Sequence, residues 1–146
     1  MAGETTLVAA TAVRQQMGNP GAGLWPLRFD LSYSPIQNEL ADVMQAGYLP
    51  AGAKVVAVSA HSTDMDSGIA AVLHSVQVGA TTIVSGLTAA QAGVAQMLPV
   101  TAAYIQAAPV ATEQLVTVTT STAAATAVAG TLTIVLWCYN AKATPA

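Results

Sequence analysis

Ionised side chains are scarce in this sequence. Lys and Arg together number 4 and Asp and Glu 7, so 8% of the 146 residues are charged, whereas soluble domains carry roughly 25%. A free monomer normally stays soluble through its surface charge. We therefore expect neighbouring subunits to cover much of the uncharged surface, which favours an oligomer or a component of a shell.

Clustered positive charge and paired cysteines are also missing. The cations Arg14, Arg28, Lys54 and Lys142 are scattered, which argues against nucleic-acid binding because DNA and RNA require a concentrated positive face. Cys138 is the single cysteine, so no intrachain disulfide is possible. The N-terminus also lacks the basic-then-apolar layout of a secretory signal. These features predict synthesis and assembly in a reducing cytoplasm.

No long apolar run accompanies the high mean hydropathy of +0.54. Charged side chains are absent between Ser67 and Thr112, but that stretch is interrupted by glycines, prolines and polar residues. A spanning helix needs about 20 predominantly apolar residues in one run. The sequence therefore argues against a membrane protein.

The chain divides into an arm, a domain and a tail. Residues 1–23 form the expected N-terminal arm, which ends in the turn-forming cluster Gly18-Asn19-Pro20-Gly21. Within it an amphipathic helix from about Thr6 to Met17 is one interpretation. The arm as a whole is either a frayed terminus or a segment that becomes ordered only against a partner, and its apolar content favours the second. Residues 24–140 form the expected domain and residues 141–146 a C-terminal tail.

Period-two patterns dominate the domain. Leu24–Tyr33 alternates apolar with polar residues, as a half-buried strand does. Further strands rich in β-branched residues are expected at 54–61, 69–78, 114–120 and 131–139, with shorter candidates at 81–84 and 101–105. Short strands separated by Gly and Pro turns predict an all-β, antiparallel sandwich of the jelly-roll type.

Local helix signals interrupt this pattern. Ser34 and Gln37 match a capping box with Pro35 at the first helical position, yet residues 41–45 also suit an extended chain, so residues 34–47 stay ambiguous. Thr88–Gln91 is a second capping-box match and predicts one helical turn within a loop. Residues 123–125, three alanines, are too few for a stable helix and are expected to form a loop.

One polar cluster suggests chemistry. His61–Gly68 contains Asp64 and Asp66, which superficially resemble the opening of a calcium loop. A calcium-binding EF-hand places glycine sixth and a bidentate glutamate twelfth, and counting from Asp64 these positions hold Ile69 and Ser75. The EF-hand match therefore fails. A divalent site of His61 with Asp64 and Asp66 remains one interpretation, and a hairpin turn is the other.

No other group of residues indicates catalysis. His74 lies in an apolar strand pattern, which is typical of a structural or interface residue. Cys138 lies between Trp137 and Tyr139, which favours an inert core thiol over a nucleophile activated by a nearby base. Serine-elbow and phosphate-binding glycine motifs are absent. We expect no enzymatic activity, no cofactor and no metal.

Aromatic residues near the two ends of the domain are candidate contacts. In 131–139 one face is apolar throughout, and the other becomes apolar at Val135, Trp137 and Tyr139. A strand that is apolar on both faces lies either centrally in the fold or at an interface. Burial in the core is the alternative for these side chains and for Trp25. The remaining interface candidates are Arg14 and Met17 of the arm.

Two segments carry a resemblance to a known family. The run from Leu49 to Val58, followed by Ser62–Gly68, resembles small virion proteins of tailed bacteriophages, as does the ending from Leu115 to Thr120 with the alanine-rich loop and Gly130–Ile134. Proteins of this kind resemble capsid decoration, or cement, proteins. The similarity covers roughly residues 29–139, and its motifs are structural.

The resemblance implies a structural virion protein on the capsid surface, made in the host cytoplasm. It implies a jelly-roll sandwich that binds outside the major capsid protein shell, as a homodimer or alternatively a trimer, and that cements neighbouring capsomers. It also favours a strand at residues 41–45. A head-fibre or tail-associated module that binds a host surface is the alternative function. A small metal-dependent hydrolase would rest on the His61–Asp66 cluster alone.

Overall fold

The computed structural model describes residues 5–7 and 23–140. The arm expected at 1–23 and the tail expected at 141–146 therefore lie almost entirely outside the described residues. Of the helix expected from about Thr6 to Met17, Thr6 and Leu7 are described, and they belong to a short strand, β1 (Thr5–Leu7). Residues 8–17 of that expected helix lie outside the described ranges.

The described chain is built almost wholly of strands joined by turns and short helices. The strands after β1 are β2 (Trp25–Tyr33), β3 (Val43–Leu49), β4 (Ala53–Ser62), β5 (Leu73–Val78), β6 (Thr81–Leu87), β7 (Ala95–Pro99), β8 (Gln114–Thr122) and β9 (Gly130–Asn140). The helices are the 3-10 helix η1 (Pro35–Asn38) and the α-helices α1 (Ala89–Ala92) and α2 (Ala102–Gln106). Among the described residues, no helix is long and apolar enough to cross a membrane.

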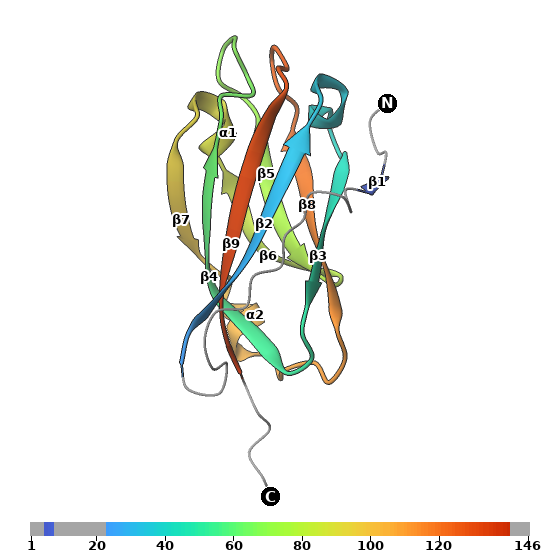
Figure 1. The fold of residues 1–146 in the computed structure, drawn as a ribbon, viewed down its shortest axis with the longest axis vertical. Coiled ribbons are helices and arrows are strands. Elements are labelled where there is room, and N and C mark those ends of the chain that lie inside the picture. The colour runs from blue at the N-terminus through green and yellow to red at the C-terminus, as the bar shows by residue number, and fades with distance from the viewer. Residues whose placement is uncertain (1–4, 8–22, 141–146) are drawn as a thin grey trace, which may run out of the picture.

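The strands form two sheets that pack face to face (Figure 1). One sheet has the order β1-β3-β8-β5-β6 and the other the order β2-β9-β4-β7. Apart from the β5–β6 hairpin, each connection from β2 to β9 carries the chain from one sheet to the other. This is the connectivity of a jelly roll. The predicted all-β, antiparallel sandwich is confirmed.

Alternating burial explains why these strands face as they do. Leu27, Phe29 and Leu31 of β2 are fully buried, and they pair with Leu136, Ile134 and Leu132 of β9 across the sheet.

The intervening β2 residues point outward and are partly or fully exposed. Because successive side chains of a strand point to opposite faces, one strand supplies both the core and an outer surface.

Most expected strands are present with small changes at their ends. The segments expected at 24–33, 54–61, 81–84, 114–120 and 131–139 correspond to β2, β4, β6, β8 and β9. The ambiguous segment 34–47 contains both expected elements in turn. The Ser34–Gln37 capping box forms at η1, and β3 begins at Val43.

Two shorter predictions are confirmed, and one predicted strand begins later than expected. The helical turn expected at Thr88–Gln91 is α1, and residues 123–125 form a loop as expected. The strand expected at 69–78 begins only at Leu73, because the Asp66 carboxylate holds the N–H groups of Ala71 and Val72 and keeps them out of the sheet ladder.

The strand expected at 101–105 is wrong, because those residues form α2. Thr101 is its N-cap, and the Ile105 N–H donates to the Thr101 carbonyl. Ala102 and Ala103 favour a helix. Strand β7 had no sequence signal, since Ala95, Gln96 and Met97 lack β-branching.

Candidate interaction surface

The residues predicted to make contacts lie in different places. Arg14 and Met17 are outside the described residues. Trp25 is buried in the core of the chain itself, with 2% of its surface exposed. Val135, Trp137 and Tyr139 are half-buried along the outer side of β9, which lies between β2 and β4. β9 is thus a central strand of its sheet. The outer side of its second half, which is apolar, still lies on the surface of the molecule.

The outer side of the sheet β2-β9-β4-β7, here called the sheet face, gathers apolar side chains from every strand. Paired residues run across it in the rows Pro26, Trp137, Ala57 and Pro99, then Arg28, Val135, Ser59 and Met97, then Asp30, Thr133, His61 and Ala95. The first row is apolar throughout and the third is mostly polar. Met97 is the most prominent apolar side chain, with 62% of its surface exposed.

Trp137 is fixed in the middle of the apolar row. Its indole Nε1 donates to Ser59 Oγ at 2.8 Å. Because this bond satisfies the polar atom of the indole, the remainder of the ring offers an apolar surface. Tryptophan held in this way is the kind of residue that anchors protein interfaces.

The charges of the sheet face are paired with each other. Arg28 Nη2 and Nε donate to Asp30 Oδ1 at 3.0 and 3.1 Å, and Thr133 Oγ1 donates to the same oxygen. Burial raises the pKa of Asp30, but the hydrogen bonds from Thr133 and Arg28 outweigh it and the pKa lies below its ordinary value. The sheet face therefore carries a neutral ion pair rather than a net charge.

The opposite sheet has a polar outer side. Gln77 Oε1 accepts hydrogen bonds from Thr117 and Thr119 of the neighbouring β8, and its amide donates to Thr82. These side chains satisfy one another with uncharged polar groups. Tyr48 of β3, 49% exposed and paired with Leu115 of β8, adds an apolar side chain at one end of this outer side.

Sequence reasoning found part of the sheet face. The alternation in β2 already separates Arg28 and Asp30 from the core residues, and Val135 and Trp137 were named as candidates. Met97 and Pro99 were missed because β7 was not predicted. The pairing of distant strands brings these residues together, so no local pattern contains the signal.

In the His61–Asp66 cluster, backbone N–H groups occupy the carboxylate oxygens of Asp66. Asp66 is buried, and its two carboxylate oxygens accept the backbone N–H groups of Ala71, Val72, Ala125 and Thr126 at 2.9–3.1 Å.

Burial alone would raise the pKa of Asp66, but these four hydrogen bonds lower it to about 2. Asp64 Oδ1 accepts the Asp66 N–H, and His61 is exposed on β4. Among the described residues, no group of three or more His, Cys, Asp or Glu side chains is placed to hold a metal ion. Asp66 instead joins the β4–β5 loop to the β8–β9 loop.

His74 and Cys138 are buried structural residues. His74 Nε2 donates to Asn38 Oδ1 at 2.9 Å, and its ring lies 5.4 Å from that of Tyr33. Burial lowers the pKa of His74 to about 4, so the imidazole is neutral at physiological pH. Burial raises the pKa of the Cys138 thiol to about 12, which keeps it protonated and unreactive, as expected.

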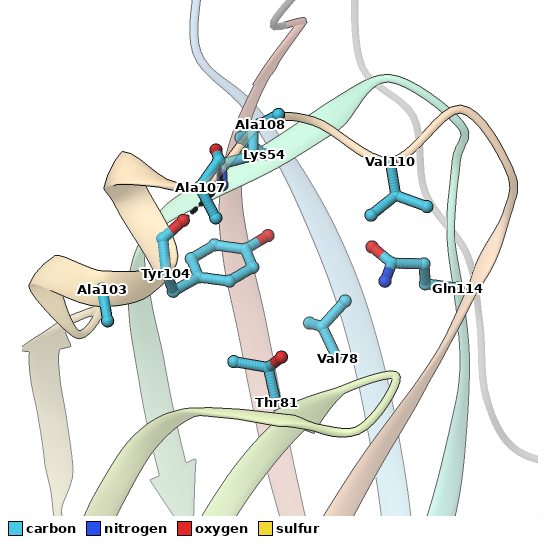
Figure 2. Close-up of a pocket in the computed structure, with 9 residues that line it drawn as sticks. All are labelled: Lys54, Val78, Thr81, Ala103, Tyr104, Ala107, Ala108, Val110 and Gln114. Atoms are coloured by element: carbon cyan, nitrogen blue, oxygen red, sulfur yellow. Dashed lines mark hydrogen bonds between the residues drawn. The ribbon is translucent and has the colours of Figure 1, made fainter.

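A cavity of about 180 Å³ lies beside α2 (Figure 2). It is at the end of the sandwich opposite the β4–β5 loop (Figure 1). The Lys54 ammonium is buried beside it, donates to the carbonyls of Tyr104 and Ala107, and lies 4.1 Å from the centre of the Tyr104 ring. Burial lowers the pKa of Lys54. Among the described residues, no carboxylate, histidine or cysteine lines the cavity. Lys54 therefore holds α2 against β4, and the cavity offers no acid–base pair.

The two sheets and their connections define a jelly-roll β-sandwich, a fold that phage capsids contain. A chain in the capsid of Ralstonia phage GP4 is similar with a TM-score of 0.78 and 18% identity, over 96% of this chain and 100% of that chain. A chain in the capsid asymmetric unit of cyanophage Pam1 is similar with a TM-score of 0.62 and 20% identity, over 90% of this chain and 96% of that chain.

At these identities the likeness shows a shared fold. No protein-family model matches the sequence, and the comparison with curated proteins finds no match either.

Proposed function

We propose that this chain is a structural virion protein that binds the outside of an assembled phage capsid and cements neighbouring capsomers. The observation that supports this proposal most strongly is the structural similarity to a chain in the capsid of Ralstonia phage GP4, which extends over 96% of this chain and 100% of that chain. A single sandwich of this size and fold therefore occurs in a phage capsid. The low charge content supports a subunit that neighbours cover.

The proposed mechanism is thermodynamic. A protein that binds only the assembled shell lowers the free energy of that state by mass action, by about 2.7 kcal/mol per site at a free concentration one hundred times Kd. Repetition over a symmetric shell multiplies a modest contact. No catalytic step is required.

The sheet face is the proposed contact with a second copy of the chain. Its apolar row around Trp137 suits burial, and the Arg28–Asp30 pair leaves it without net charge. Two copies can therefore bring the same face together without like-charge repulsion, as a two-fold symmetric contact requires. A homodimer is the simplest assembly with this contact, and a trimer is the alternative.

Imaging of intact particles tests the proposal. In a density map of the virion whose genome encodes this chain, we expect the sandwich at repeated positions over the outer capsid lattice. Density only at a vertex or on the tail would instead support the head-fibre or tail-associated alternative. Particles that contain no copy of the chain would overturn both.

A further inference from the structure

Exposed apolar side chains gather at one end of the sandwich, here called the loop end (residues 34–42, 63–72, 88–94 and 123–129). Figure 1 shows η1, α1 and the β4–β5 and β8–β9 loops together at this end. Ile69 is 86% exposed, Ile36 64% and Leu40 53%, and Val94 and Val128 are also exposed. A single exposed aliphatic side chain is ordinary, but several on adjoining loops are typical of an interaction site.

The loops that carry these side chains are fastened to one another. Ala124 N–H donates to the Asn38 carbonyl, Val128 N–H to the Met65 carbonyl, and Met65 N–H to the Ala90 carbonyl, at 2.9–3.2 Å.

Asp66 lies at the centre of this network, with its carboxylate bound to backbone N–H groups of two loops. Gly68 contributes by allowing close approach, since a Cβ there would lie 2.6 Å from Thr126 Oγ1. A surface that is already ordered loses little conformational entropy on binding.

The charges of the loop end have one sign. Asp64 is exposed and Glu39 is half-buried there, while Asp42 and Asp66 are buried among the loops. In the part of the chain that the structure describes, the lysine and arginine residues are Lys54 and Arg28, and both lie on strands away from this end. Two loop ends in contact would bring acids together, which disfavours self-association through this surface.

We infer that the loop end docks into an apolar depression of the assembled capsid shell whose rim carries lysine or arginine side chains. This inference rests on the proposed function and assigns the shell contact to a surface different from the sheet face. Ile69 and Ile36 enter the depression, and Asp64 faces the cationic rim. The apolar centre determines how long the complex lasts, and the acidic charge steers its formation.

Two matched variants test the apolar part. Ile69→Asp places a charge at the loop end, and Leu24→Asp places the same charge on an aliphatic side chain that is 62% exposed at the opposite end. Both are measured for binding to immobilised particles that lack the chain, after thermal unfolding shows intact folds. We expect Ile69→Asp to weaken binding by roughly tenfold or more and Leu24→Asp to bind like the wild type.

A third variant tests the charge. Asp64→Asn keeps an oxygen that can accept the Asp66 N–H and removes only the negative charge. We expect a slower association rate at low salt, an unchanged dissociation rate, and a difference from the wild type that disappears as salt is added.

The possible contrary results have distinct meanings. Full binding by Ile69→Asp, or an equal loss in Leu24→Asp, overturns the inference while the proposed function stands. Loss of self-association in Ile69→Asp identifies a second copy as the occupant and also overturns it. If the wild type does not bind the particles, the proposed function itself fails.

Discussion

His74 shows how a single buried group sets a pH limit on the fold. Burial lowers its pKa from 6.5 to about 4, so the unfolded chain binds a proton more readily than the folded chain between these values. Protonation therefore favours unfolding as the pH falls below about 6.5. The stability that the neutral imidazole allows is fully present above that pH and is lost progressively toward pH 4.

We expect the free energy of unfolding to fall by on the order of 3 kcal/mol between pH 7 and pH 4 through His74. Urea unfolding at a series of pH values measures this, and His74→Gln should remove most of the decline whatever its stability at pH 7. The control is His61→Gln, which removes an exposed imidazole and leaves His74 in place. An undiminished decline in His74→Gln contradicts the assignment.

Asp66 contributes to stability through its four backbone donors. Its pKa of about 2 lies below the ordinary 3.8, so its contribution is present above about pH 4 and is lost as the pH falls toward 2. Asp66→Asn replaces one acceptor oxygen with a donor that faces N–H groups. We expect a loss of roughly 2–4 kcal/mol, measured by urea unfolding at pH 7.

The isosteric change Asp64→Asn is the control for Asp66→Asn, since it retains an acceptor for the Asp66 N–H. It should change the free energy of unfolding by less than about 1 kcal/mol. Equal effects of the two substitutions would show that the buried carboxylate does not hold the loops together.

At the scale of the element, β3 depends on one glycine. Gly47 lies at an irregularity in the pairing with β8, and a Cβ added there would lie 2.5 Å from Phe29 Cε1 in the facing sheet. The core therefore closes over β3 only because this position has no side chain.

Gly47→Ala should destabilise the protein by roughly 1–3 kcal/mol, because overpacking forces the Phe29 ring or the strand to move. Gly23→Ala is a matched control, since its φ of 153° is close to the 157° of Gly47 and nothing lies within 4 Å of the added Cβ. Thermal unfolding of the two variants separates the steric effect from the backbone effect. A similar loss in both would refute the steric explanation.

At the scale of the whole molecule, the two outer sides of the sandwich differ in chemistry. One is apolar around Trp137 and carries an internally paired charge. The middle of the other carries Gln77 and threonine side chains that hydrogen-bond to one another, with Tyr48 at one end. This difference makes the sheet face the better candidate for the proposed contact between copies.

Val135→Lys should therefore abolish the proposed self-association, because it places a cation in the sheet face next to Arg28. Thr82→Lys adds the same charge to an exposed position of β6, in the other sheet. Light scattering across a dilution series should give the mass of a 14.7 kDa monomer for Val135→Lys, and an oligomer for the wild type and Thr82→Lys. A wild type that is already monomeric would remove the sheet face as a contact between copies.

The sequence by itself determined the class of fold and the low content of charged residues. Alternation along β2 and β9 fixes which side chains enter the core, because the strand period depends only on local geometry. The capping box at Ser34 and the helical turn after Thr88 were also readable, since their hydrogen bonds join residues three or four positions apart.

The tertiary structure alone decided where the contact surfaces lie. Alternation places Trp137 on the outer side of β9, but only the strand order shows that β2, β4 and β7 bring their outer residues beside it to form one surface. The sequence left Asp66 as a possible metal ligand. In the structure its carboxylate accepts N–H groups of residues about 60 positions away. Such pairings depend on chain closure over long separations, which no local pattern of residues encodes.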